Sequence, residues 1–280
     1  MSIRIVTDST ADIPVETANK LNIKVVPLNV HFGQSTFKDG IDLTTDNFFD
    51  KLIQGPHFPS TSQPSIGDFM EAYKPIIEKG DEIISIHISS KLSGTTNSAI
   101  QAAEQLKDDG NIAVVDTLQA SLTVGLTAMA AAKAVLDGKV FQEVVDLAKS
   151  TSDRAELFAL LDTLEYLEKG GRIGKARALV GGLLKIKPLI TIMDGEVGEF
   201  GKVRSRQSGI QKLKEVCQNA GNLESLVVAY STEEEDALKL SQELTTVLSG
   251  NASPMIARVG PVIGTHAGPR VIAVGMIKSK

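Results

Sequence analysis

Apolar residues in this chain fall into short runs of β-branched side chains, separated by longer stretches in which they recur every three or four positions. In the first half, the short runs predict strands at Ile3–Thr7, Lys24–Phe32, Glu82–Ile88 and Ile112–Val115. The helical period predicts helices at Val15–Leu21, Thr45–Ile53, Gly67–Glu78, Thr95–Leu106 and Val124–Val135. Strands that alternate with helices in this way are typical of an α/β fold with a parallel sheet.

After Asp153 the spacing of these runs becomes less regular. Strands are predicted at Glu156–Leu161, Pro188–Met193, Ser225–Tyr230, Met255–Val259 and Val271–Met276. Helices are predicted at Leu164–Glu168, Ala176–Leu184, Ser208–Asn219 and Glu233–Leu248. We therefore expect two α/β domains, residues 1–152 with a parallel sheet and residues 153–280 with a mixed sheet, joined by a linker at Thr151–Arg154.

Composition narrows the class of protein. The formal net charge is −5 and no long basic run occurs, which argues against nucleic acid as a partner. Cys217 is the only cysteine, so no disulfide framework or cysteine metal cluster is available. No basic segment followed by an apolar run opens the sequence, and we expect a cytoplasmic protein without a membrane-spanning segment.

The segment Ser89–Ala99 joins an apolar strand to a helix through hydroxyl residues and one glycine, Gly94. The first turn of a helix has unpaired backbone N–H groups and a partial positive charge, so a phosphate or carboxylate fits there. Ordinary helix capping by Ser and Thr is the alternative explanation. Because ligands of open parallel sheets bind at the carboxyl ends of the strands, we expect this turn and those after the neighbouring strands to meet at one crevice.

Three further segments carry more polar groups than their local structure needs. Pro59–Ser65 holds four hydroxyls, three of them between two prolines, although a loop that caps the next helix would also explain it. Gly264–Pro269 is predicted to be a glycine-rich turn that carries His266, either for a ligand or facing solvent. Leu164–Gly174 reads as a short helix, a glycine cap and a turn that carries Arg172, whose simplest role is a surface salt bridge.

Taken together and in order, these segments resemble the DegV family of bacterial lipid-binding proteins. The matching stretches span essentially the whole chain: VTDSTADIP at the start, TSQPS, Ser90–Ala99, LEYLEKGGRIG, KPLI at Lys187–Ile190, KVR at Lys202–Arg204, and GTHAGP. The resemblance implies a three-layer N-terminal domain and a mixed-sheet C-terminal domain, with one long-chain fatty acid in a tunnel between them. It also implies that a separate fatty-acid kinase phosphorylates the bound acid, and that an acyltransferase passes the acyl phosphate to phospholipid synthesis. The protein itself would be a carrier with no cofactor, in transient contact with the membrane.

By the same resemblance, the carboxylate contacts fall on Thr61, Ser93 and His266, with the amides of Gly94 and Thr95 nearby. Cationic side chains are expected near the mouth of the tunnel, facing the kinase or its phosphate: Arg172, Lys202, Arg204 and Arg270. Arg270 stands where the family usually has glycine after Gly268-Pro269, which alters the histidine turn. Independently of the resemblance, the amphipathic stretch Ala176–Leu184, with Gly181-Gly182 as a hinge, is predicted to act as a lid.

Two other classes of function remain open. A serine hydrolase could combine Ser93 and His266 with Asp8 or Asp116, but the nucleophile elbow GxSxG is absent. The four histidines are scattered without metal-ligand spacing, so we expect no metal site. A binding protein for another small anionic metabolite is the remaining alternative.

Overall fold

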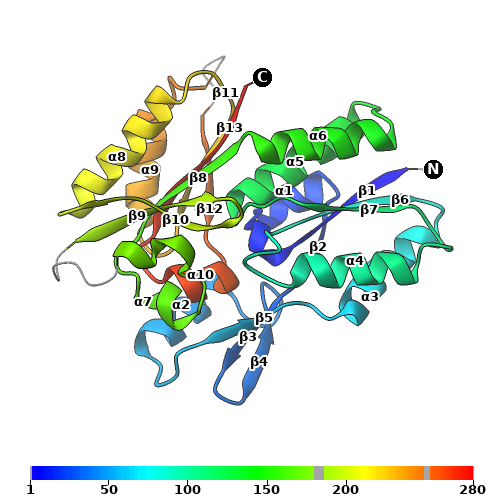
Figure 1. Ribbon diagram of the computed structural model, residues 1–280, viewed down its shortest axis with the longest axis horizontal. Coiled ribbons are helices and arrows are strands. Elements are labelled where there is room, and N and C mark those ends of the chain that lie inside the picture. The colour runs from blue at the N-terminus through cyan, green and yellow to red at the C-terminus, as the bar shows by residue number, and fades with distance from the viewer. Residues whose placement is uncertain (1, 180–185, 249–252, 280) are drawn as a thin grey trace.

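The computed structural model describes residues 2–179, 186–248 and 253–279. Two large sheets lie side by side, with helices on their outer faces and between them (Figure 1). The chain completes the first sheet before it enters the second. This is the α/β architecture, with one parallel and one mixed sheet, that the pattern of strands and helices predicts.

The first sheet is parallel, and its strands are ordered β2-β1-β6-β7. These strands are β1 (Ile3–Asp8), β2 (Lys24–Val26), β6 (Glu82–His87) and β7 (Ile112–Asp116). Helices α3 (Ile66–Ile77) and α4 (Thr95–Gln105) pack on one face, and α5 (Leu122–Leu136) and α6 (Phe141–Asp153) pack on the other. Helix α1 (Val15–Lys20) connects β1 to β2. A three-layer arrangement results, because both faces of a parallel sheet must be covered.

The second sheet is mixed, in the order β10-β9-β8-β13-β11-β12. Only β11 and β12 pair in parallel, and the other neighbours are antiparallel. The strands are β8 (Ala155–Leu160), β9 (Lys187–Met193), β10 (Glu196–Val203), β11 (Leu223–Tyr230), β12 (Met255–Arg258) and β13 (Ile272–Lys278). Helices α8 (Arg206–Asn219) and α9 (Glu234–Glu243) cover its outer face, and the inner face turns toward α5.

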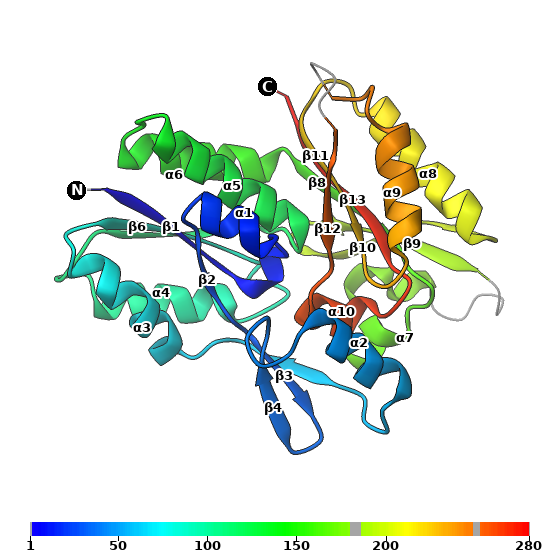
Figure 2. The same ribbon diagram turned by 180° about the vertical axis from the view of Figure 1, so that it is seen from behind.

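A third, three-stranded antiparallel sheet was not expected from the sequence. It is ordered β4-β3-β5 and consists of β3 (Asn29–Phe32), β4 (Ser35–Lys38) and β5 (Ser60–Ser62). Figure 2 shows the β3–β4 hairpin projecting away from both large sheets, with α2 (Thr45–Gln54) beside α10 (Pro261–Ala267). The prediction of one strand over Lys24–Phe32 is therefore wrong, because the chain leaves the parallel sheet at Pro27 and pairs elsewhere from Asn29.

Two other predictions of local structure are also wrong. The segment Thr151–Arg154 is no linker, because Thr151 and Ser152 are buried in the last turn of α6, a helix that was not predicted. The histidine turn Gly264–Pro269 is largely helical, since α10 runs from Pro261 to Ala267 with proline at its start and Gly268 after its end.

Helix α7 (Glu165–Lys169) lies where it was expected. Two other elements of the second half differ in extent from their predictions. Helix α9 ends at Glu243 instead of continuing to Leu248. Residues Gly174–Leu179 form a 3₁₀ helix, η2. The remainder of the predicted helix and lid at Ala176–Leu184, including Gly181-Gly182, lies outside the described residues.

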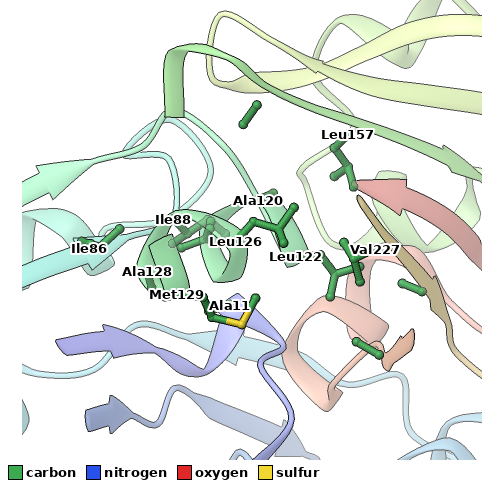
Figure 3. Packing of buried hydrophobic residues seen from close by; sticks show 14 of the residues in the cluster. Ala11, Ile86, Ile88, Ala120, Leu122, Leu126, Ala128, Met129, Leu157 and Val227 are labelled. Carbon is green, nitrogen blue, oxygen red and sulfur yellow. The ribbon is translucent and has the colours of Figure 1, made fainter. Parts of the chain in front are cut away.

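The main hydrophobic core joins the two large sheets. Ile86 and Ile88 from the parallel sheet, and Leu157 and Val227 from the mixed sheet, belong to one buried cluster. Figure 3 shows Leu122 of α5 among these groups. The boundary at residue 152 coincides with the change of sheet, but because this core is continuous, the division into domains 1–152 and 153–280 stays a prediction.

Candidate functional site

A cavity of about 340 Å³ lies between the two large sheets. On one side, it is bounded by the segments that follow β1, β6 and β7, which contribute Thr10, Ile88 and Ala120. The predicted meeting of these turns at one crevice is therefore confirmed. The volume lies within the range of roughly 300–1,000 Å³ that is usual for small-molecule sites.

The opposite wall is the inner face of the mixed sheet. Alternate residues of β13 and its neighbour β8 point into the cavity, because successive side chains of a strand face opposite sides. The contributing side chains of the mixed sheet, including those at the strand ends, are all aliphatic: Leu157, Ala159, Leu161, Ile190, Ile192, Val197, Val271 and Ala273. Their immediate neighbours, such as Leu160 and Ile272, pack outward against α8 and α9. This wall can contact a hydrocarbon chain but offers it no polar side-chain partner.

Polar side chains gather where β5 and α10 meet. Thr61 lies on β5, His266 lies in the last turn of α10, and both line the cavity. Thr61 Oγ1 and His266 Nε2 are 2.9 Å apart. These two residues are 205 positions apart in the sequence, and they meet because α10 packs on the small sheet.

His266 is held as a neutral imidazole. Burial and, to a lesser extent, the positive charge of nearby Arg172 together lower its pKa to about 4. At neutral pH the ring can therefore exchange hydrogen bonds with Thr61 without carrying a charge. Arg172 supplies the positive charge of the cavity lining instead.

Ser93 lines the cavity beside the start of α4. Its backbone N–H donates to Ser89 O at 3.1 Å, and its Oγ lies 2.8 Å from Thr95 Oγ1. Thr95 is completely buried behind Ser93, and Gly94 makes room for the side chain of Gln63, which a Cβ at residue 94 would overlap. Of the segment Ser93–Thr95, Ser93 is thus the residue that lines the cavity.

The cationic residues predicted at the tunnel mouth occupy different environments. Arg172 lines the cavity, and its guanidinium donates to Leu92 O at 3.3 Å and to Gly170 O at 2.7 Å. Lys202, at the end of β10, and Arg204, just beyond it, are exposed and outside the cavity lining. Arg270 is also outside the lining, and its guanidinium lies 3.7 Å from Asp162 and 3.8 Å from Glu233, so its charge is partly compensated there.

Comparisons with other proteins agree with this architecture. A family model described as "Uncharacterised protein, DegV family" matches residues 2–279. The chain belongs to the DegV family. A DegV domain-containing protein of Deinococcus radiodurans is 36% identical over 283 residues, which cover 99% of this chain and 98% of that protein. A second DegV domain-containing protein, from Clostridium acetobutylicum, is 33% identical over 287 residues, which cover 100% of this chain and 99% of that protein.

Solved structures of DegV proteins match over the full chain. A fatty-acid-binding DegV family protein from Thermus thermophilus superposes with a TM-score of 0.91 at 33% identity and full coverage of both chains. A stearic-acid-binding protein from Eubacterium ventriosum gives 0.90 at 29% identity, with 99% of this chain and 98% of that one covered. DegV from Bacillus subtilis, a fatty-acid-binding protein, gives 0.87 at 30% identity, with 99% and 100% covered.

Asp8, one of the aspartates considered for a serine hydrolase, pairs with a different histidine in this DegV protein. Its Oδ2 accepts a hydrogen bond from His87 Nδ1 at 2.8 Å, and His87 Nε2 lies 2.6 Å from Ser85 Oγ. Tyr73 donates to the same Ser85 oxygen at 2.7 Å. Asp8, Ser85 and His87 have no exposed surface, so this triad-like group cannot reach a substrate and acts as a structural network.

The other candidate aspartate and the cavity histidine do not form a triad either. Asp116 accepts hydrogen bonds from the backbone of Ser90 and Leu118. His266 Nε2 contacts Thr61, and Nδ1 has no hydrogen-bond partner among the described residues. The DegV cavity thus lacks, in the part of the chain that is described, the acid–base–nucleophile relay that a serine hydrolase needs.

Sequence reasoning missed four polar residues of the cavity lining: Thr10, Ser62, Gln63 and Ser121. Thr10 and Ser121 follow β1 and β7, so their position at strand ends was a usable signal. Gln63 belongs to the TSQPS stretch and donates to Ser98 at 3.2 Å, but nothing in the sequence distinguished it from a loop residue.

The described parts of this DegV chain contain no cluster of typical metal-ligating side chains and no helix that could span a membrane. Across residues 2–179, 186–248 and 253–279, no group of three or more His, Cys, Asp or Glu side chains is arranged to hold a metal ion. Over the same ranges, no helix has both the length and the apolarity needed to cross a bilayer.

Proposed function

We propose that this protein binds one long-chain fatty acid in the cavity between its two large sheets, with the carboxylate at Thr61, Ser93 and His266. The observation that carries the proposal is the composition of the cavity wall. One side is a continuous aliphatic sheet face, and hydroxyl and imidazole groups converge at one part of the lining. The fatty-acid-binding DegV structures with the same fold support a fatty acid as the ligand.

Hydrocarbon burial supplies the free energy of binding in this proposal. An acyl chain of about sixteen carbons has a gross transfer term of about 11 kcal/mol, at about 0.8 kcal/mol for each buried methylene. Ordering of the chain and lost translational freedom reduce the net value. The transfer free energy of the hydrocarbon is nevertheless large enough that the carboxylate needs hydrogen-bond partners only to offset its burial, and need not add to the affinity.

The carboxylate needs hydrogen-bond donors, because an unpaired buried charge is costly. Hydroxyl groups of Thr61 and Ser93 suit this role, and Arg172 adds a positive charge to the same lining. Single hydroxyl donors hold a carboxylate less rigidly than a bidentate arginine fork. One carboxylate oxygen would then remain reactive.

A loosely held carboxylate would suit transfer of a phosphoryl group from a separate kinase. We propose that the protein presents its fatty acid to such a kinase and that the acyl phosphate feeds phospholipid synthesis through an acyltransferase. Exposed Lys202 and Arg204 would contact the kinase or its phosphate. The carrier would itself perform no catalysis, would act in the cytoplasm and would visit the membrane transiently.

Mass spectrometry of an organic extract of the purified, denatured protein tests the central step. We expect close to one fatty acid per chain. An extract without fatty acid, together with no binding of added oleate or palmitate by the intact protein, would rule out the lipid assignment. Competition by inorganic phosphate or a sugar phosphate, but not by oleate, would favour a small anionic metabolite instead.

Alanine variants test the head-group contacts. Ser93→Ala and His266→Ala are expected to lower acyl phosphate formation by a partner kinase at least tenfold, with the protein still folded. Ser60→Ala is the matched control, because Ser60 lies on β5 next to Thr61 but is exposed and outside the cavity lining. Unchanged rates in both cavity variants would remove the assignment. Labelling of Ser93 by a fluorophosphonate would favour the hydrolase alternative.

A further inference from the structure

The two ring nitrogens of His266 have different surroundings. Nε2 lies 2.9 Å from Thr61 Oγ1. Protein atoms cover Nδ1, and among the described residues no donor or acceptor lies within hydrogen-bonding distance of it. The Cα hydrogen of Gly170 points at this covered nitrogen, because a Cβ built on Gly170 would lie only 2.2 Å from Nδ1.

This arrangement favours one of the two neutral tautomers. With the proton on Nδ1, a buried N–H would face the C–H of Gly170 and would lack an acceptor, which is costly. With the proton on Nε2, the N–H donates to Thr61 Oγ1, and the lone pair of Nδ1 faces the weakly positive C–H of Gly170. The second arrangement satisfies the donor and is the more stable one.

We propose that Gly170 is a positioning residue: by closing off Nδ1 it fixes the Nε2–H tautomer of His266, so that Thr61 keeps its hydroxyl hydrogen for the bound carboxylate. In the other tautomer Thr61 would donate its hydrogen to Nε2 and would present only lone pairs to the ligand. The lone pairs of Thr61 Oγ1 would repel the negatively charged carboxylate oxygens. This inference rests on the proposed function, and it adds the direction of the hydrogen bonds at the head-group site.

The backbone does not require glycine at position 170. Gly170 has φ −76°, an ordinary right-handed value, whereas the adjacent Gly171 has φ +70°. Glycine is therefore needed for the chain reversal at 171, and at 170 the constraint comes from the imidazole, with Tyr166 O also close. A methyl group at 170 would push the ring away from Thr61.

Gly170→Ala tests the proposal by measuring oleate binding. We expect at least tenfold weaker binding with the fold intact. Gly171→Ala is the matched control, because it strains the same loop but its Cβ would meet nothing within 4 Å; it should bind oleate within about twofold of the wild type. In a His266→Ala background, Gly170→Ala should have no further effect, because the ring that it displaces is gone.

Nitrogen-15 NMR of the imidazole, assigned by its loss in His266→Ala, gives a readout that a purely structural role would not move. The ligand-free wild type should show the Nε2–H tautomer at pH 7, and Gly170→Ala should shift His266 toward a mixture. An Nδ1–H tautomer in the wild type, wild-type binding by Gly170→Ala, or additive losses in the double variant would each overturn the inference. Failure of the wild type to bind any fatty acid would instead overturn the proposed function, and the tautomer measurement would still stand.

Discussion

At the scale of single residues, buried polar groups organise the wall of the cavity. Asp8 is the clearest case, since its Oδ1 accepts the Thr10 N–H at 3.0 Å and its Oδ2 accepts the Ile88 N–H at 3.3 Å. Thr10 and Ile88 follow two different strands, and both line the cavity. His87 Nδ1 supplies a further hydrogen bond to the Asp8 carboxylate. Asp8 therefore joins the ends of β1 and β6 where a ligand would contact them.

Substitutions along this network should differ in cost according to what they leave unpaired. Tyr73→Phe removes a single hydrogen bond to Ser85 and should lower the free energy of unfolding by about 1 kcal/mol. His87→Ala deprives the buried Asp8 of a partner and should cost about 3 kcal/mol or more. Urea unfolding measures both. Tyr230→Phe is the control, since its hydrogen bond to Glu234 is exposed; a His87→Ala cost no larger than this control would contradict the network.

At the scale of elements, two buried carboxyls hold the start of α10. Asp12 accepts the Gly260 N–H at 2.9 Å and contacts Ser121 Oγ at the start of α5. Asp39 lies beside it and is hydrogen-bonded to Ser9 and to the backbone of Val262. Burial raises the pKa of Asp12 to about 8 and that of Asp39 to about 7. The folded protein therefore favours the protonated, neutral form of both carboxyl groups.

Stability should consequently fall as the pH rises. Each carboxyl contributes stability that is complete below its unfolded pKa, near 3.8, and that is lost as the pH rises through its folded pKa. Asp39→Asn, which is always neutral, should gain stability relative to the wild type between pH 5 and 8, by at most about 1.4 kcal/mol per pH unit. Denaturant unfolding at several pH values measures this. Asp68→Asn is the control, because its pKa is lowered and its effect should be constant over that range; a constant effect of Asp39→Asn would refute the prediction.

The β9–β10 hairpin closes against the parallel sheet through a single turn. Ser89 donates its hydroxyl to Gly195 O at 2.7 Å, and a Cβ at Gly195 would lie 2.6 Å from Ser89 Oγ. Gly195 also has φ +82°. Both strands of this hairpin line the cavity, so this turn helps to hold the edge of the aliphatic wall in place.

Gly195→Ala should therefore lower the free energy of unfolding by more than backbone strain alone would. Gly80→Ala is the matched control, with φ +76° and nothing within 4 Å of the added Cβ. Gly80→Ala should cost about 1 kcal/mol, and Gly195→Ala at least twice as much, with faster release of a bound fatty acid. Unfolding free energies and dissociation rates measure this difference. Equal costs and equal release rates would show that the turn contact is unimportant.

The sequence predicted elements well where one periodicity extends over a whole segment, as in β6 and α4. It failed where an element is short or defined by its partner. Thr61 lies in a three-residue strand of polar side chains, β5, which exists because β3 is beside it. His266 lies on a seven-residue helix that starts with a proline, contains Gly264 and is followed by Gly268, a composition typical of a turn. Both of these proposed head-group residues were thus picked out by motif, and their contact depended on packing that no local pattern encodes.

At the scale of the whole molecule, the cavity belongs to neither sheet alone. The parallel sheet contributes the ends of its strands, and the mixed sheet contributes the aliphatic face. Because the principal core also crosses between them, the two sheets should unfold in one transition. A ligand between them stabilises that single folded state, by about 2.7 kcal/mol at a concentration of one hundred times Kd.

Filling the cavity should separate binding from folding. Ala159 points into the cavity from the centre of the aliphatic wall, so Ala159→Phe would place its ring where a hydrocarbon chain would lie. We expect the amount of copurified fatty acid to fall at least tenfold, while the melting temperature of the ligand-free protein stays within about 3 °C of the wild type, since the ring enters a cavity. Ala132→Phe is the contrasting variant, because Ala132 is buried in α5 outside the cavity lining and a ring there would overpack the core. It should lower the melting temperature instead. Near-stoichiometric fatty acid in Ala159→Phe would place the ligand elsewhere in the molecule.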